Sequence, residues 1–87
     1  MQKPLVHLNG TSKADLSDGY HRAMRATHDA LEALQAASPN ARDYYPQGPD
    51  AYTIARREHD ARCEALRGVI RDMTELYEHV EPVGALP

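Results

Sequence analysis

Two long stretches of helical sequence, one on each side of a proline-rich segment, constrain this chain more than any other feature. In both stretches apolar side chains recur every three or four positions, which places them on one face of an α-helix. The sequence therefore predicts an all-α fold, with helices over residues 12–37 and 51–80 joined by a loop over 38–50 into an antiparallel two-helix hairpin. The main faces consist of Leu16, Tyr20, Thr27, Leu31 and Leu34 in the first helix, and Leu66, Val69, Ile70, Met73, Leu76, Tyr77 and Val80 in the second.

The predicted ends of the helices come from capping residues and prolines. Thr11 or Ser12 can accept a hydrogen bond from the first turn of the first helix, and Pro39 prevents that helix from continuing. Asp50 is expected to cap the second helix, whose pattern stops before Pro82.

The two ends of the chain are predicted to be non-helical. Residues 1–10 carry Leu5 and Leu8 ahead of the turn pair Asn9-Gly10, which indicates an extended N-terminal arm. A tail over residues 81–87 completes a single domain of 87 residues.

A chain of this length has little material for a core. Eighty-seven residues bury only roughly 60 % of the surface that the unfolded chain exposes, and two helices packed once each keep an uncovered side. If the hairpin turns symmetrically about Tyr44, Met24 is expected opposite Leu66. We expect a second copy to cover the remaining sides, which gives a dimeric helical bundle. Those sides carry Ala23, Ala26, Ala30, Ala33 and Ala37 in the first helix, and Ile54, Ala61, Ala65 and Gly68 in the second.

The charge pattern argues against several functional classes. Ten Lys and Arg side chains stand against 13 Asp and Glu, for a formal net charge of −3, and the two signs are interspersed along both halves. Nucleic-acid binding is not expected without a basic stripe. No apolar run approaches the roughly 20 residues that cross a bilayer, and the first residues do not form a signal peptide. The predicted location is the cytoplasm, which the single cysteine, Cys63, also suits.

Residues 38–50 are the predicted contact region for a partner protein. The segment holds three prolines and is longer than a connection between two helices needs to be. Arginine and tyrosine dominate the binding energy of protein interfaces, and prolines limit the ordering that binding requires. The alternative is that both tyrosine rings pack against the hairpin end near Leu34 and Ile54. The predicted partner-binding residues are Arg42, Asp43, Tyr44, Tyr45 and Gln47.

Histidine and cysteine side chains are the candidates for chemistry. His59 and Cys63 are four positions apart on one helix, and His28 is expected at a similar height on the other. A structural zinc site needs four ligands, and a two-helix scaffold offers no cleft in which Cys63 could act as a nucleophile. We therefore predict no enzymatic activity, no metal and no cofactor. An alternative function is binding of a small anionic ligand at a dimer interface by His28, His59 and Arg62.

Two short motifs resemble a known group of proteins. His7-Leu8-Asn9-Gly10-Thr11-Ser12 and Pro39-Asn40-Ala41-Arg42-Asp43-Tyr44-Tyr45-Pro46-Gln47-Gly48 are similar to segments of short bacteriophage- and prophage-encoded helical-hairpin proteins. That group has no assigned chemistry, so no catalytic or ligand residue is transferred. The resemblance implies a phage-derived accessory protein inside a bacterial host, and by analogy one that binds a host protein and inhibits antiviral defence. A structural or assembly component of the phage particle is the other open alternative.

Overall fold

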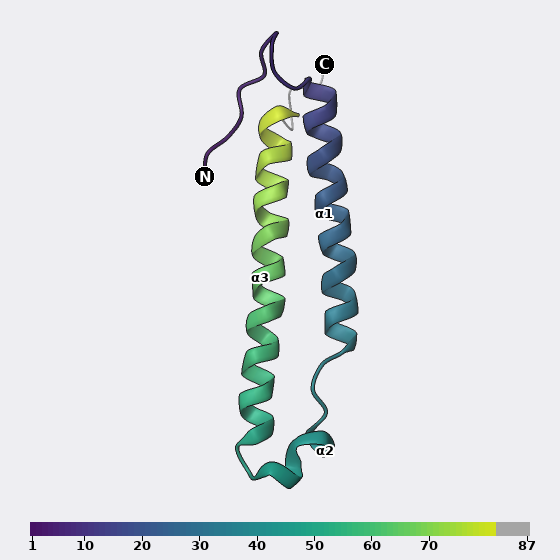
Figure 1. Cartoon of the computed structure of the whole chain (residues 1–87), viewed down its shortest axis with the longest axis vertical. Helices are drawn as coiled ribbons and strands as arrows, with labels where there is room; N and C mark the ends of the chain where they lie inside the picture. The colour runs from purple at the N-terminus through teal and green to yellow at the C-terminus, as the bar shows by residue number, and fades with distance from the viewer. Residues whose placement is uncertain (82–87) are drawn as a thin grey trace.

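The computed structural model describes residues 1–81, in which every regular element is helical. The elements are α1 (Lys13–Ala36), α2 (Ala41–Tyr44), the 3-10 helix η1 (Tyr45–Gln47) and α3 (Ala51–Val80). The predicted all-α class is thereby confirmed. α1 and α3 lie side by side and run in opposite directions, and α2 and η1 lie at the end where the chain passes between them (Figure 1). Residues 82–87 of the predicted tail lie outside the described residues.

The ends of α1 carry local capping interactions. At its start the Oγ of Ser12 accepts a hydrogen bond from the backbone N–H of Asp15 at 3.1 Å. At its end the Oγ of Ser38 donates to the backbone carbonyl of Gln35 at 2.7 Å. The helix begins one residue later and ends one residue earlier than the predicted range 12–37.

The first turn of α3 is held differently from the expectation. Asp50 stands at the capping position, but its side chain makes no capping hydrogen bond. Its backbone carbonyl accepts from the N–H of Ile54 at 3.0 Å, and the carbonyl of Gly48 accepts from the N–H of Ala51 at 3.4 Å. The predicted cap position of Asp50 is therefore confirmed, but the first turn is satisfied by backbone carbonyls and not by the carboxylate.

The segment predicted as a loop, residues 38–50, contains helical structure. The side chain of Asn40 accepts from the backbone N–H of Arg42 at 3.0 Å and so starts α2. Pro46 occupies the first turn of η1, where a missing N–H is tolerated, and Gly48 ends that turn with a φ of 116°. The segment is thus a helical corner with defined geometry.

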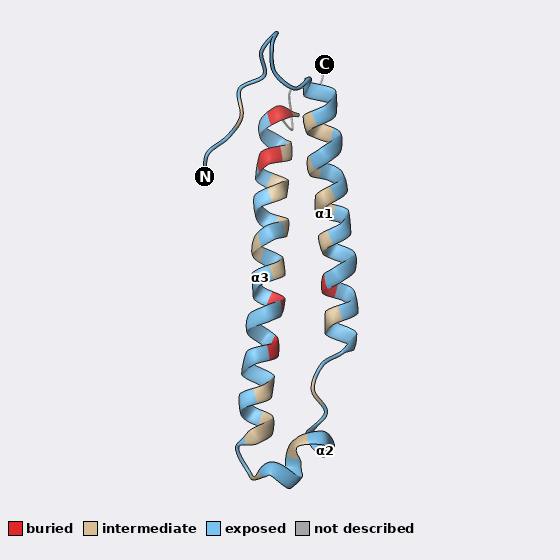
Figure 2. Ribbon diagram, viewed as in Figure 1, coloured by how far each residue is buried: buried red, intermediate tan, exposed pale blue. Residues whose placement is uncertain are grey.

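The core between the long helices is thin. The buried apolar residues are Leu31 on α1 with Cys63, Leu76 and Val80 on α3, and no described side chain is completely buried (Figure 2). The molecule measures 61 × 22 × 22 Å and has a radius of gyration of 18.7 Å. A compact domain of this length would have a radius of gyration of about 12 Å. One copy alone is therefore elongated and leaves much of both helices in solvent.

The register between α1 and α3 differs from the predicted one. The hydroxyl of Thr74 lies 3.0 Å from the sulfur of Met24, about two helical turns beyond Leu66, which was expected there. The connection is not symmetric, because residues 38–40 run alongside the first turns of α3 before α2 and η1 turn the chain at the end of the pair (Figure 1). The register predicted from a symmetric turn about Tyr44 is therefore wrong.

The N-terminal arm folds back along α3 of its own chain. Lys3 forms an ion pair with Glu75 at 3.2 Å, and the carbonyl of Pro4 accepts a hydrogen bond from the ring of His79 at 2.8 Å. The arm is thus held by polar contacts while its apolar side chains stay in solvent. Leu5 and Leu8 are 80 % and 99 % exposed.

Candidate protein-binding site

The helical corner that follows α1 presents the predicted partner-binding residues. Arg42, Asp43, Tyr44, Tyr45 and Gln47 all lie on α2 and η1, and all except Tyr44 are exposed. The prediction left open whether both tyrosine rings pack against the helices, and the structure separates them. The ring of Tyr44 is half-buried, whereas Tyr45 is 79 % exposed. The ring of Tyr44 is therefore partly covered by the rest of the chain, whereas the ring of Tyr45 is free to contact another molecule.

A cleft of about 450 Å³ lies beside the exposed tyrosine. Its volume falls within the roughly 300–1,000 Å³ of typical ligand pockets, although this cleft is open on one side. The aromatic and proline walls are suited to an apolar side chain from a partner. The lining residues are Ala41, Tyr45, Gly48, Pro49 and Tyr52.

Sequence reasoning did not identify Tyr52 as a site residue. It lies in the first turn of α3, and the bend through Gly48 and Pro49 brings it to the same cleft as Tyr45. The only signal in the sequence is a third tyrosine soon after the Tyr44-Tyr45 pair. The bend that brings Tyr52 to the cleft depends on the positive φ of Gly48, and the sequence pattern alone did not predict this bend.

A positive charge borders this cleft. The side chain of Tyr52 hydrogen-bonds the guanidinium of Arg56, and with the nearby carboxylate of Asp60 this raises the pKa of Arg56 above its ordinary value. The Nε of Arg56 lies 3.2 Å from Asp60. A guanidinium next to an aromatic wall is a common arrangement at protein interfaces, where arginine and tyrosine are both enriched.

The corner is tied to α3 by a polar cluster in which exposed Ser38 contacts buried His59. The Oγ of Ser38 lies 3.1 Å from Nε2 of His59, and the Sγ of Cys63 lies 3.5 Å from the same nitrogen. His59 and Cys63 are only 5 % and 4 % exposed. A substrate therefore has no direct access to this thiol, and the cluster fixes the point from which the chain leaves α1.

The residues of the alternative ligand site are not brought together. His59 is buried at the seam between the helices, while His28 and Arg62 are exposed. The contact of Met24 with Thr74 and that of Ser38 with His59 place His28 well above His59 along the pair. The equal height expected of His28 and His59 is therefore not observed within one chain, and the alternative of a ligand site between two copies stays a prediction.

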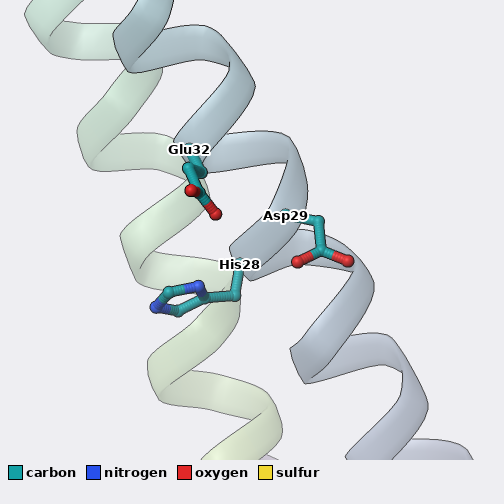
Figure 3. A group of neighbouring side chains, drawn as sticks. All are labelled: His28, Asp29 and Glu32. Carbon is teal, nitrogen blue, oxygen red and sulfur yellow. The ribbon is translucent and has the colours of Figure 1, made fainter.

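His28 instead lies in a group with Asp29 and Glu32, whose potential ligand atoms are within 4.8 Å of one another. Figure 3 shows that all three project from α1. They are exposed neighbours on one helix, and an ion bound there would keep most of its ligands from water. We assign no metal site to this group.

Comparisons with models of known protein families, with curated proteins and with solved structures found no match to this chain. The similarity to phage proteins therefore remains a prediction from the two motifs. Within residues 1–81, no helix has the length and apolar character that crossing a membrane requires. The function must be argued from the geometry of the helical corner.

Proposed function

We propose that this protein is a non-enzymatic, phage-derived binding module that forms an antiparallel helical hairpin, pairs with a second copy and binds a protein of its bacterial host. The proposal rests on one observation. Tyr45 is 79 % exposed on a short helical turn, beside a cleft of about 450 Å³ that Tyr52 and Pro49 help to line. Large aromatic side chains beside a pocket that can receive a partner's side chain are typical of binding hot spots.

The corner also needs little rearrangement to bind. Asn40 caps α2, Pro46 restricts η1, and the contact of Ser38 with His59 fixes the corner against α3. Ordering a loop on binding lowers affinity, so a surface held in this way keeps more of the free energy of its contacts. This supports recognition of a folded protein through the exposed faces of Arg42, Asp43, Tyr45 and Gln47.

The biological role follows from the resemblance of the motifs. Such binding would take place in the cytoplasm of an infected bacterium, and we propose inhibition of antiviral defence as its effect. We assign no catalytic step, since Cys63 is 4 % exposed and contacts His59.

Affinity capture from a bacterial host lysate tests the proposal. The tagged wild-type protein is compared with Tyr45→Ala and with the control Arg22→Ala, whose side chain is 79 % exposed on α1. We expect a partner that the wild type and the control recover equally and that Tyr45→Ala recovers at least about ten-fold less, as for a hot spot. Circular dichroism should show the same helicity for all three. Equal recovery by Tyr45→Ala would remove the corner from the account.

A further inference from the structure

We propose that two copies pack face to face about a two-fold axis parallel to the long axis, so that α1 of each copy lies against α3 of the other. This inference rests on the proposed self-association and specifies its surface and register. The occupant of the exposed helix faces is thus a second copy of this chain.

Exposed small and apolar residues form one stripe on each long helix. On α1, the stripe of Ala26, Ala30, Ala33 and Ala37 lies about a third of a turn around the helix from Leu31. On α3, a corresponding stripe lies about a third of a turn around the helix axis from His59. Viewed from the N-terminus of each helix, the rotation from Leu31 and that from His59 have the same direction. That stripe contains Ile54 and Val69, which are 54 % and 42 % exposed, with Ala61 and Ala65. Two exposed carboxylates, Glu58 and Asp72, lie on the same side of α3.

The two stripes lie on the same side of the helix pair. Each is displaced in the same rotational sense from the side that faces the neighbouring helix. Because α1 and α3 run in opposite directions, equal displacements carry both stripes to one common side (Figure 1). The result is a face two helices wide, bordered near the C-terminal end of α3 by the N-terminal arm, which contacts Glu75 and His79.

The observed register matches small residues at equal heights. The contact of Met24 with Thr74 and that of Ser38 with His59 set α1 against α3. At this register Ala30 is level with Gly68, Ala33 with Ala65, and Ala37 with Ala61. A two-fold axis parallel to the helices preserves height, so each of these residues meets its small counterpart in the second copy.

Close approach of two helix backbones is possible at these positions. A Cβ atom added to Gly68 would meet only the guanidinium of Arg71, at 3.7 Å, so the surface above this glycine is open. Alanine and glycine let neighbouring helices approach more closely than larger side chains do. The charged group of His28, Asp29 and Glu32 projects from a different side of α1 and stays in solvent.

The area of the face lies at the lower end of the range for specific interfaces. At the observed register, residues 18–36 of α1 are level with residues 62–80 of α3, so the shared face is about 29 Å long, and two packed helices are about 20 Å wide. This footprint, on the order of 570 Å² per copy or about 1,100 Å² in total, exceeds the roughly 1,000 Å² expected of a specific interface. One copy alone exposes 6622 Å², against about 5,100 Å² for a compact chain of its mass.

Disulfide trapping tests this arrangement in chains that also carry Cys63→Ala. Ala33→Cys and Ala65→Cys are expressed separately and together, then oxidised. We expect about ten-fold more covalent dimer from the co-expressed pair than from either variant alone, because cysteines with Cα atoms more than about 7 Å apart are not bridged.

Sedimentation of the unmodified protein separates the possible failures. A dimer together with the mixed cross-link supports the inference. A dimer in which Ala33→Cys cross-links to itself would overturn the proposed register while leaving self-association intact. A monomer at all concentrations would overturn both the inference and the proposed dimer, but not the partner-binding role of the corner.

Discussion

The hydroxyl oxygen of Ser38 lies 3.1 Å from Nε2 of His59, which ties the end of α1 to the side of α3. Below this contact the chain continues along α3 to α2 and η1 before it reverses (Figure 1). The contact therefore determines where the exposed tyrosine corner stands relative to the two long helices.

Removal of this hydroxyl should destabilise the protein. In Ser38→Ala, the buried ring of His59 loses one of its two polar neighbours, and the exposed carbonyl of Gln35 loses a donor that water can replace. The loss at the buried ring costs about 1 kcal/mol. Thermal unfolding should then occur about 4–8 °C lower at equal protein concentration. Ser17→Ala, within α1, is the control and should leave the midpoint nearly unchanged. An unchanged midpoint in Ser38→Ala would show that the contact contributes no stability.

The thin core predicts very different effects for the same substitution at two leucines. Leu31 is 8 % exposed, so Leu31→Ala should lower the free energy of unfolding by about 2–4 kcal/mol. Leu5 is 80 % exposed, and Leu5→Ala should change it by less than about 0.5 kcal/mol. Urea denaturation followed by circular dichroism measures both values. Similar losses in the two variants would contradict the assigned core.

Alanine substitutions at the N-cap residues of α1 and α3 should lower the free energy of unfolding by different amounts. Ser12→Ala removes the hydrogen bond to Asp15 and should cost about 1 kcal/mol. Asp50→Ala should cost much less, because the side chain of Asp50 makes no capping hydrogen bond. The same denaturation experiment compares them, and a larger loss in Asp50→Ala would mean that this aspartate caps α3 in solution.

A charge placed on the proposed dimer face should dissociate the dimer. Ala33→Glu buries a carboxylate between two copies, whereas Gln35→Glu places a new carboxylate on the nearly opposite side of the same helix. We expect at least a ten-fold rise in the dimer dissociation constant for Ala33→Glu, equivalent to about 1.4 kcal/mol. Gln35→Glu should sediment like the wild type. Equal association of both variants would argue against the alanine face.

The helices were predictable because their signals are local. Apolar spacing and Ser12 determine α1 to within one residue at each end. The helical corner was not predicted, because Pro39, Pro46 and Pro49 were interpreted only as signs of a loop. Two of them lie next to turns that Asn40 and Gly48 make possible.

The register and the cleft depend on contacts between distant residues. A symmetric turn about Tyr44 gave the wrong register, since the path along α3 is set by the contact of Ser38 with His59. The same path brings Tyr52 to Tyr45, which no local pattern indicates. Exposure of Tyr45 rather than Tyr44 likewise follows from the way α2 packs.

The most direct test of the central claim is photo-cross-linking from the corner in the bacterial host. A photoreactive phenylalanine analogue replaces Tyr45 in one variant and Tyr20, which is half-buried on α1, in a second. The account predicts a covalent adduct with one host protein from position 45 and no such adduct from position 20. Absence of an adduct at position 45, or equal adducts from both positions, would contradict partner binding through this corner.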